Sequence, residues 1–527
     1  MCGIAGCIGT RDVDTINRML DALPHRGPDD RGIHVHGDAV FGHTRLSIVD
    51  VAKGRQPILA DDGHSGIICN GEIYNFQQIR DRLSSRHPFT THSDSEVVLH
   101  LYREKGPDCV RDLDGMFAFA IFDGDDIMLA RDPIGIKPLY YGYVEDRLYF
   151  SSELGAMSLA GVNEVDEFPC GHYYTPKGGF VPYYEVPPVP DAFLTDEKEA
   201  ASSIRTTLAT VVKKRLLADR QIHVGSFCSG GLDSSLIAAI AAEEIPHLHT
   251  FAVGMKDVSG EESDDLKASR IAAAHIGSTH HEYVFTEEEY YTALPKVIEK
   301  LETYDPSLVR CAVPCYFTCK LAARHVTVVL TGEGADELFA GYQYMKQLPQ
   351  ERLNPEARRL VKDVHNINLQ RADRMGMLFS LELRVPFFDT AMVDLGLKIS
   401  PDLKIREHNG RRMEKWILRK AFDGTGLLPD EILWRYKVQY TQGAGCEHLG
   451  ERLAEREISD TELERLRAEN PAAVLNSKEA AYYFKLFRKT HRQDSVLKSI
   501  GIWTGFDFEE ERAPVRGTLD GSWTPAA

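Results

Sequence analysis

Short apolar runs separated by turns dominate the first two hundred residues of the chain. The clearest of these runs cover residues 116–122, 127–131 and 139–143. Glycine, aspartate and proline fill the segments between them, and runs of this length between such turns predict strands joined as hairpins.

A different pattern begins near residue 197, where apolar runs alternate with segments of helical periodicity. Strands are predicted at residues 222–228, 250–254, 282–285 and 326–330, and helices at residues 197–219, 236–242 and 264–275. Strands that alternate with helices predict a doubly wound parallel sheet, an α/β fold whose ligands bind at the carboxyl ends of the strands.

A proline-rich segment separates the two patterns. Residues 186–190 read Val-Pro-Pro-Val-Pro, which favours an extended linker, so a boundary is placed within residues 186–196. The predicted domains are residues 1–190 and 197–527. The end of the second, residues 506–527, is rich in charge, glycine and proline, which is typical of a mobile tail.

The composition argues against several classes of protein. The net charge of −18 disfavours general nucleic-acid binding, and no apolar run is long enough to span a membrane. The amino-terminus lacks the regions of a signal peptide, so a cytoplasmic location is expected. Ten cysteines follow no zinc pattern and are expected to be reduced. Three of them, Cys311, Cys315 and Cys319, have helical spacing and are interpreted as packing residues.

A glycine-rich loop at residues 229–235, Ser-Gly-Gly-Leu-Asp-Ser-Ser, lies between a predicted strand and a predicted helix. Adjacent glycines let the backbone approach a ligand, and a helix start directs N–H groups at an anion. The loop lacks the lysine of a P-loop and carries Asp233 instead, which suits phosphates only if a cation such as Mg²⁺ bridges them. It resembles the phosphate loop of the PP-loop ATP pyrophosphatases.

That resemblance implies an ATP site. A second acidic loop, residues 331–337, follows a predicted strand and brings Asp336 to join Asp233 as a Mg²⁺ ligand. The residues expected to bind ATP are Cys228, Ser229, Gly230, Gly231, Leu232, Asp233, Ser234, Ser235, Val253, Thr331 and Gly332.

The amino-terminus carries a candidate nucleophile. Loss of the initiator methionine is expected because Cys2 is small, and it would leave Cys2 with an α-amino group whose pKa of about 7.7 to 8.0 suits a base. Four further motifs occur at residues 25–29, 44–49, 70–75 and 93–96. Together they closely resemble the class II glutamine amidotransferases, an N-terminal-nucleophile family with an α+β fold of stacked antiparallel sheets and helices.

The resemblance assigns a role to each motif. Arg45 would hold the glutamine α-carboxylate with two N–H groups, with the backbone of Ile48 and Val49 close by. Glu72 and Asp94 would pair with its α-ammonium group. The catalytic residues would be Cys2 and an oxyanion hole formed by the Asn70 amide and the Gly71 N–H.

The order of these features, a class II glutaminase, a proline linker and a PP-loop domain, resembles the glutamine-dependent asparagine synthetases. Further matches lie at residues 302–305 and 368–389, and Lys437 follows Trp434 and Arg435 as the family's pyrophosphate-contacting lysine does. The implied reaction adenylates aspartate with ATP and Mg²⁺, and ammonia from glutamine then attacks. Lys437 would stabilise pyrophosphate, and Glu333 would take a proton.

The acceptor site departs from that family. Arg310 can still bind a carboxylate, but Leu308 stands where the family has a threonine. Residues 438–442, Val-Gln-Tyr-Thr-Gln, lack the two acids that the family carries beside an aromatic residue. An amidotransferase of the same build that acts on another carboxylic acid is therefore the alternative.

Two further interpretations are disfavoured. Ring closure like that of a β-lactam synthetase needs no glutaminase, and a nucleotide-sensing or scaffolding protein would not need the full set of catalytic residues. The expected partners are small molecules: glutamine, ATP, and aspartate or another acid. Homo-oligomerisation is common among such proteins and stays open for this chain.

Overall fold

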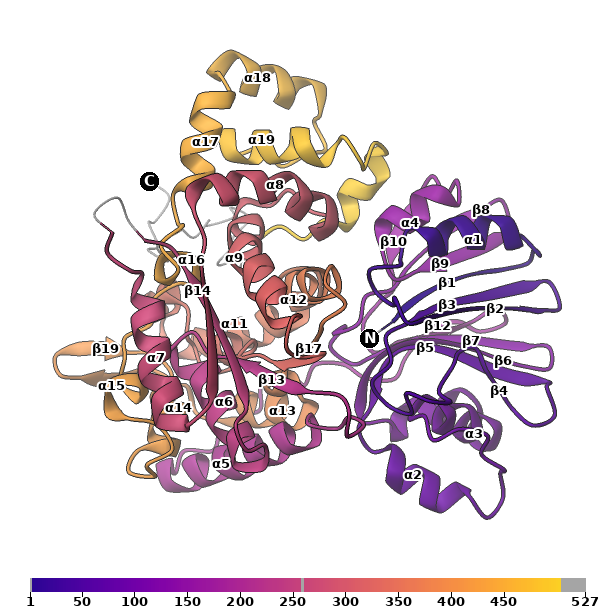
Figure 1. The fold of residues 1–527 in the computed structure, drawn as a ribbon, viewed down its shortest axis with the longest axis horizontal. Helices are drawn as coiled ribbons and strands as arrows, with labels where there is room; N and C mark the ends of the chain where they lie inside the picture. The colour runs from indigo at the N-terminus through magenta and orange to yellow at the C-terminus, as the bar shows by residue number, and fades with distance from the viewer. Residues whose placement is uncertain (1, 257–259, 504–527) are drawn as a thin grey trace.

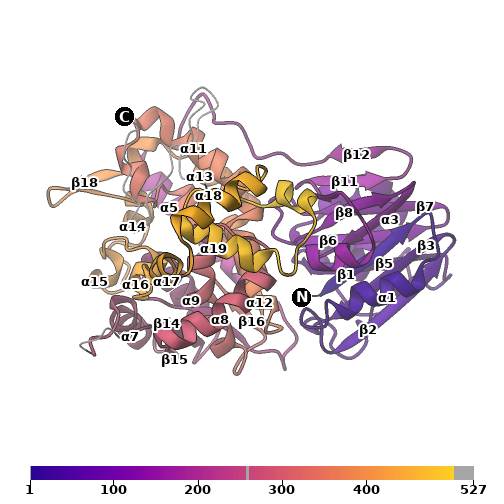
Figure 2. The same cartoon turned by 90° about the horizontal axis from the view of Figure 1, so that it is seen from above.

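The computed structural model describes residues 2–256 and 260–503 of the chain. Two parts lie side by side, an amino-terminal part built from two sheets and a carboxyl-terminal part built around a parallel sheet (Figure 1). A view turned by 90° keeps the same arrangement (Figure 2). The predicted mobile tail, residues 506–527, lies outside the described residues.

The first sheet of the amino-terminal part has six strands in the order β10-β8-β9-β1-β3-β2, and every pair is antiparallel. Its strands are β1 (Gly3–Ile8), β2 (Asp30–His36), β3 (Ala39–Arg45), β8 (Tyr140–Val144), β9 (Arg147–Ser151) and β10 (Val165–Glu167). Helices α1 (Val13–Asp21) and α4 (Leu154–Leu159) pack on its outer face.

The second sheet also has six antiparallel strands, in the order β12-β11-β7-β6-β5-β4. Its strands are β4 (Ile58–Leu59), β5 (Ser65–Ile73), β6 (Gly115–Asp123), β7 (Asp126–Arg131), β11 (His172–Thr175) and β12 (Gly179–Pro182). Helices α2 (Phe76–Leu83) and α3 (Ser95–Lys105) cover its outer face.

An apolar core that includes Ile4, Phe41, Ile68 and Phe122 joins the two sheets. Alternation along the strands directs these side chains inward, so the two sheets stack face to face. The predicted strands at residues 116–122, 127–131 and 139–143 are confirmed, as is the α+β fold of stacked antiparallel sheets.

The carboxyl-terminal part contains the predicted parallel sheet, with strand order β15-β14-β13-β16-β17. The strands are β13 (Val224–Phe227), β14 (His249–Gly254), β15 (Thr279–Val284), β16 (Val328–Leu330) and β17 (Glu382–Arg384). Helices α6 (Leu232–Glu244) and α7 (Asp264–Ile276) contribute to one core, and α8 (Glu287–Leu301) and α9 (Pro306–Ala322) to the other. The doubly wound fold is therefore confirmed.

Several boundaries differ from the sequence prediction: β13 and β16 each begin two residues later than predicted, and α6 begins four residues earlier. Strand β15 begins three residues before the predicted start, because Thr279 already pairs with His249 and the polar residues there hide the strand pattern. Helix α5 (Glu197–Lys214) ends before residue 219.

The linker at residues 186–196 has neither helix nor strand, but it is held in place. Arg358 donates hydrogen bonds to the carbonyl oxygens of Pro187 at 2.8 Å and Val186 at 3.1 Å. Asp196 then caps helix α5 by accepting the N–H of Glu199 at 2.8 Å. The predicted extended segment is therefore anchored on the carboxyl-terminal part.

The remaining elements complete the carboxyl-terminal part. They are α10 (Ala335–Leu338), α11 (Gln350–Asp363), α12 (Asn368–Met377), α13 (Thr390–Lys398), α14 (Trp416–Phe422), α15 (Asp430–Leu433), α16 (Tyr440–Gly443), α17 (Leu449–Glu457), α18 (Asp460–Glu469), α19 (Lys478–Phe487) and the hairpin of β18 (Arg406–His408) and β19 (Arg411–Met413).

All ten cysteines are free, and Cys315 and Cys319 pack in the core as predicted. Among the described residues no helix is long and apolar enough to cross a membrane.

Candidate active sites

Cys2 lies directly before β1, on the side of the amino-terminal part that faces the carboxyl-terminal part. Its side chain is buried, and burial raises the pKa of the thiol. The Cys2 backbone N–H donates to Asn70 Oδ1 at 3.0 Å, and the Cys2 carbonyl oxygen accepts from Arg26 Nε at 3.0 Å. Both neighbours are fully buried, so the nucleophile is held by its backbone.

The two predicted oxyanion-hole residues lie next to Cys2 on β5. The Nδ2 atom of Asn70 is buried and has no hydrogen-bond partner among the described residues. A Cβ at Gly71 would lie 2.1 Å from the carbonyl oxygen of Met116, so no larger residue fits there. An unpaired buried donor is costly, which suits a group that awaits a developing negative charge.

The predicted glutamine ligands surround the same place. Arg45, at the end of β3, donates to the carbonyl oxygens of Val49, Asp50 and Val51 at 3.3, 2.7 and 3.3 Å. Burial has the largest effect on the pKa of the Cys2 thiol, while the charge of Arg45 lowers that pKa and the charge of Glu72 raises it.

The two predicted acids are buried. Glu72 Oε2 has no hydrogen-bond partner among the described residues and lies 3.8 Å from Arg384 Nη2. Asp94 Oδ2 accepts the N–H of Ile73 at 2.7 Å. Burial raises the pKa of both carboxyl groups, and nearby carboxylates raise that of Glu72 further. An ammonium group placed beside them would favour their charged forms.

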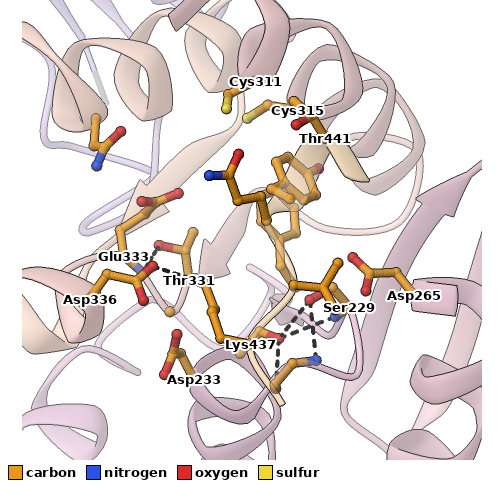
Figure 3. Close-up of a pocket in the computed structure, with 18 of the residues that line it drawn as sticks. Ser229, Asp233, Asp265, Cys311, Cys315, Thr331, Glu333, Asp336, Lys437 and Thr441 are labelled. Carbon is orange, nitrogen blue, oxygen red and sulfur yellow. Dashed lines mark hydrogen bonds and ion pairs between the residues drawn. The ribbon is translucent and has the colours of Figure 1, made fainter. Parts of the chain in front are cut away.

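A second site is a cavity of about 280 Å³ at the carboxyl ends of the parallel strands (Figure 3). Of the predicted ATP-binding residues, those that line the cavity are Ser229, Gly231, Leu232, Asp233, Ser234, Val253, Thr331 and Gly332. The predicted phosphate loop therefore faces the cavity, with the amino-terminus of α6 directly behind it.

Three predicted residues, Cys228, Gly230 and Ser235, do not line the cavity. Cys228 and Ser235 are buried and contact each other. Gly230 has a φ of +74°, and a Cβ there would lie 2.3 Å from the carbonyl carbon of Ala268. These residues shape the loop from behind rather than face the cavity.

Lys415 lies between Asp233 and Asp336 and forms an ion pair with each. Lys415 Nζ lies 2.5 Å from a carboxylate oxygen of each acid, and Lys437 Nζ lies 2.7 Å from Asp336 Oδ2. Burial would raise the pKa of Asp336, but the two ammonium groups outweigh it and hold that pKa below its ordinary value. Asp233 and Asp336 are thus each paired with at least one lysine side chain in the cavity.

The two acids also suit a metal ion. Asp233 Oδ1 is buried without a hydrogen-bond partner among the described residues. Oxygen ligands of this kind are those that Mg²⁺ prefers. The pair therefore fits the predicted Mg²⁺ site.

Lys415 was not predicted from the sequence. It follows the β18–β19 hairpin, adopts a left-handed conformation with a φ of 54° and is almost fully buried. An isolated lysine in an unremarkable segment gives no signal, since its contact with Asp233 spans 182 residues.

The predicted acceptor and base residues form ion pairs at the cavity wall. Glu333 pairs with Arg371 of α12, and Arg310 pairs with Glu479 of α19, where Arg310 Nε lies 2.7 Å from Glu479 Oε1. Arg310 Nη1 is buried and has no partner among the described residues. One donor of Arg310 is therefore left for a carboxylate, while Arg371 and Glu479 are residues that sequence reasoning missed.

The residues that depart from the family pattern lie at the same cavity. Leu308 and Val438–Thr441 line it, whereas Gln442 does not. The hydroxyl groups of Tyr440 and Thr318 lie 2.9 Å apart. The thiols of Cys311 and Cys315 also face this region (Figure 3).

Comparison with known proteins matches both parts of the chain. A model described as a glutamine amidotransferase domain matches residues 1–183, and one described as asparagine synthase matches residues 203–363 and 349–503. The chain belongs to the asparagine synthetase family.

Similar asparagine synthetases come from distant organisms. A probable glutamine-hydrolysing asparagine synthetase of Schizosaccharomyces pombe is 40% identical, covering 92% of this chain and 93% of the relative. A probable asparagine synthetase of Dictyostelium discoideum is 36% identical, with 95% and 96% covered. Asparagine synthetase B of Escherichia coli is 37% identical, with 95% and 93% covered. The similarity extends over nearly the full length of each relative.

Proposed function

We propose that this asparagine synthetase family member amidates L-aspartate with ammonia released from glutamine, consuming ATP and releasing AMP and pyrophosphate. The proposal depends on one observation: the same chain contains two sites whose side chains are already arranged for the two halves of the reaction. Buried Cys2 lies beside Asn70, whose Nδ2 has no hydrogen-bond partner among the described residues, and the phosphate loop faces a cavity with Asp233, Asp336 and Lys437. The names of the relatives support the same activity.

The first half of the reaction takes place at Cys2. Once the initiator methionine is removed, the α-amino group accepts the thiol proton, and the thiolate attacks the side-chain carbonyl of glutamine. The Asn70 Nδ2 and Gly71 N–H groups stabilise the oxyanion. Ammonia leaves, and water hydrolyses the thioester. Arg45 binds the α-carboxylate of glutamine, and Glu72 and Asp94 bind its α-ammonium group.

The second half takes place in the cavity. The side-chain carboxylate of aspartate attacks the α-phosphorus of ATP, which forms an acyl-adenylate and releases pyrophosphate. Lys437 and Lys415 neutralise charge on the departing group. Asp233 and Asp336 would hold Mg²⁺, which supplies further positive charge to the phosphates when bound.

Ammonia then attacks the activated carbonyl, and AMP leaves. Glu333 takes a proton from the attacking nitrogen, and its ion pair with Arg371 orients its carboxylate. Ammonia must travel unprotonated, so a passage closed to bulk water between the two sites is part of the proposal.

Aspartate is the proposed acceptor, with Arg310 as its carboxylate ligand. An amidotransferase for another carboxylic acid is the second candidate, because Leu308 and Val438 replace polar or acidic residues of the family pattern at the cavity wall.

We place the enzyme in the cytoplasm, which fits its ten unpaired cysteines. The domain boundary is proposed within residues 186–196.

The test is a pyrophosphate-release assay with ATP, Mg²⁺, an ammonium salt and a panel of carboxylic acids. We expect release of pyrophosphate and AMP with aspartate and formation of asparagine. Release with another acid and none with aspartate would favour the second candidate. ADP as the product would contradict the proposed chemistry altogether.

A further inference from the structure

The loop that follows β3 shapes the proposed glutamine site. Its carbonyl groups at Val49, Asp50 and Val51 accept all the hydrogen bonds given above for Arg45. Asp50 has a φ of 49°, a left-handed conformation that a residue with a side chain adopts at a cost. The loop is also tight, because a Cβ at Gly54 would lie 2.6 Å from Arg45 Nη2. A strained loop of this kind keeps its shape only if neighbouring groups hold it.

Asp219 holds this loop from the other part of the molecule. It lies between α5 and β13, and its carboxylate accepts the N–H of Asp50 at 3.2 Å and that of Val51 at 2.9 Å. Its own N–H donates to the carbonyl oxygen of Ile48 at 3.0 Å. Hydrogen bonds from N–H groups to a carboxylate are stronger than those between neutral groups. A single residue therefore fixes three consecutive peptide groups next to the strained residue.

We propose that Asp219 is a positioning residue for glutamine hydrolysis. It holds residues 48–51 in the conformation that directs the Arg45 guanidinium toward the glutamine α-carboxylate, without contact with the substrate. This inference rests on the proposed role of Arg45. The glutamine site is then complete only when the carboxyl-terminal part is docked, and the segment that completes it leads directly into β13 and the phosphate loop.

Steady-state kinetics with glutamine and with an ammonium salt test the proposal in the full-length protein. Asp219→Ala removes two charge-assisted hydrogen bonds, so we expect KM for glutamine to rise about tenfold or more. Asp219→Asn keeps one acceptor and should cause a smaller rise. Ammonium-dependent kcat should stay unchanged in both variants. Arg220→Ala alters the exposed neighbour and serves as the matched control.

A substrate without the α-carboxylate separates positioning from general damage. Glutamine α-methyl ester cannot use Arg45 as an ion-pair partner, so wild type and Asp219→Ala should hydrolyse it with similar kcat/KM. Combining Asp219→Ala with Arg45→Ala should add little to the effect of Arg45→Ala alone.

Two results would overturn the proposal: an unchanged KM for glutamine in Asp219→Ala, or an equal loss with glutamine and with ammonium. If Arg45→Ala itself leaves KM unchanged, the assignment of Arg45 fails, whatever Asp219→Ala does.

Discussion

The guanidinium group of Arg26 and the carboxylate of Asp373 form a two-point ion pair between the two parts of the molecule, with N–O distances of 2.7 and 3.0 Å. Arg26 also donates to the Cys2 carbonyl oxygen. Arg26 has no exposed surface, and Asp373 is nearly as deeply buried. This pair connects the position of the nucleophile to helix α12, which also carries Arg371.

Asp373→Ala should therefore destabilise the protein and impair the use of glutamine. Removal of Asp373 leaves the Arg26 charge buried, with Glu153 as its remaining counterion among the described residues, and a broken buried pair typically costs about 3–5 kcal/mol. Thermal unfolding and glutaminase kinetics measure the two effects. Asp394→Ala breaks an exposed ion pair with Lys398 on α13 and is the matched control, for which we expect less than about 1 kcal/mol. Equal melting temperatures for the two variants would contradict the expectation.

Cys2→Ala should abolish glutamine-dependent synthesis while synthesis from ammonium salts continues. The reason is that Cys2 serves only the first site, whereas the cavity carries out adenylation without it. Measurement of asparagine with each nitrogen source checks this separation. Cys170→Ala, which changes another thiol in the same part of the molecule, should retain both activities. Loss of both activities in Cys2→Ala would refute the separation of the two sites.

Lys415→Met should reduce synthesis with either nitrogen source. It removes an ammonium group that lies 2.5 Å from both Asp233 and Asp336, at the place proposed for the departing pyrophosphate. Removal of one preorganised charge from an active site commonly lowers kcat by about 10²–10³-fold. Pyrophosphate release measures this loss, and glutamine hydrolysis should persist. Lys420→Met on the surface of α14 should change neither, so a similar loss there would point to a general effect.

Glu337 should make the protein less stable as the pH rises toward neutrality. Burial, together with the charges of Asp336 and Glu333, raises the pKa of Glu337 from 4.5 to about 7. The folded protein thus keeps the proton on Glu337 at pH values where the unfolded chain has lost it. Stability is fully present below pH 4.5 and falls by about 3 kcal/mol as the pH rises from 4.5 to about 7.

The comparison that isolates this effect is wild type against Glu337→Gln in buffer free of magnesium. Glutamine can still accept the hydrogen bonds that Tyr342 and Asn368 donate to Glu337 Oε1, both at 2.8 Å. Thermal unfolding at pH 5 and pH 8 should show a decline in wild type that the variant lacks. A parallel decline in both proteins would assign the effect to other groups.

Local patterns predicted part of the fold. Apolar runs between turn residues predicted β6, β7 and β8, and helical patterns predicted α5, α6 and α7. The start of β15 was missed, because His280 and His281 are polar residues near the beginning of the strand. Its start depends on pairing with β14, which is a tertiary contact.

The sites were predicted where a motif is contiguous and missed where contacts are distant. The phosphate loop and the Asn70–Glu72 segment each lie within a few residues, so their resemblance to motifs of known families identifies them. Lys415, Asp219 and Arg371 act on partners 182, 168 and 38 residues away. No rule of spacing connects such residues, because only the folded chain brings them together.

Asn70 Nδ2 and Asp233 Oδ1 are each buried and have no hydrogen-bond partner in the part of the chain that the structure describes. Both atoms lose hydration on folding and regain a partner only when a ligand arrives, so occupancy of either site should protect the chain against unfolding and proteolysis. The lifetime of this enzyme in a cell would then follow its supply of glutamine and ATP, which a protease-resistance assay at graded ligand concentrations would reveal.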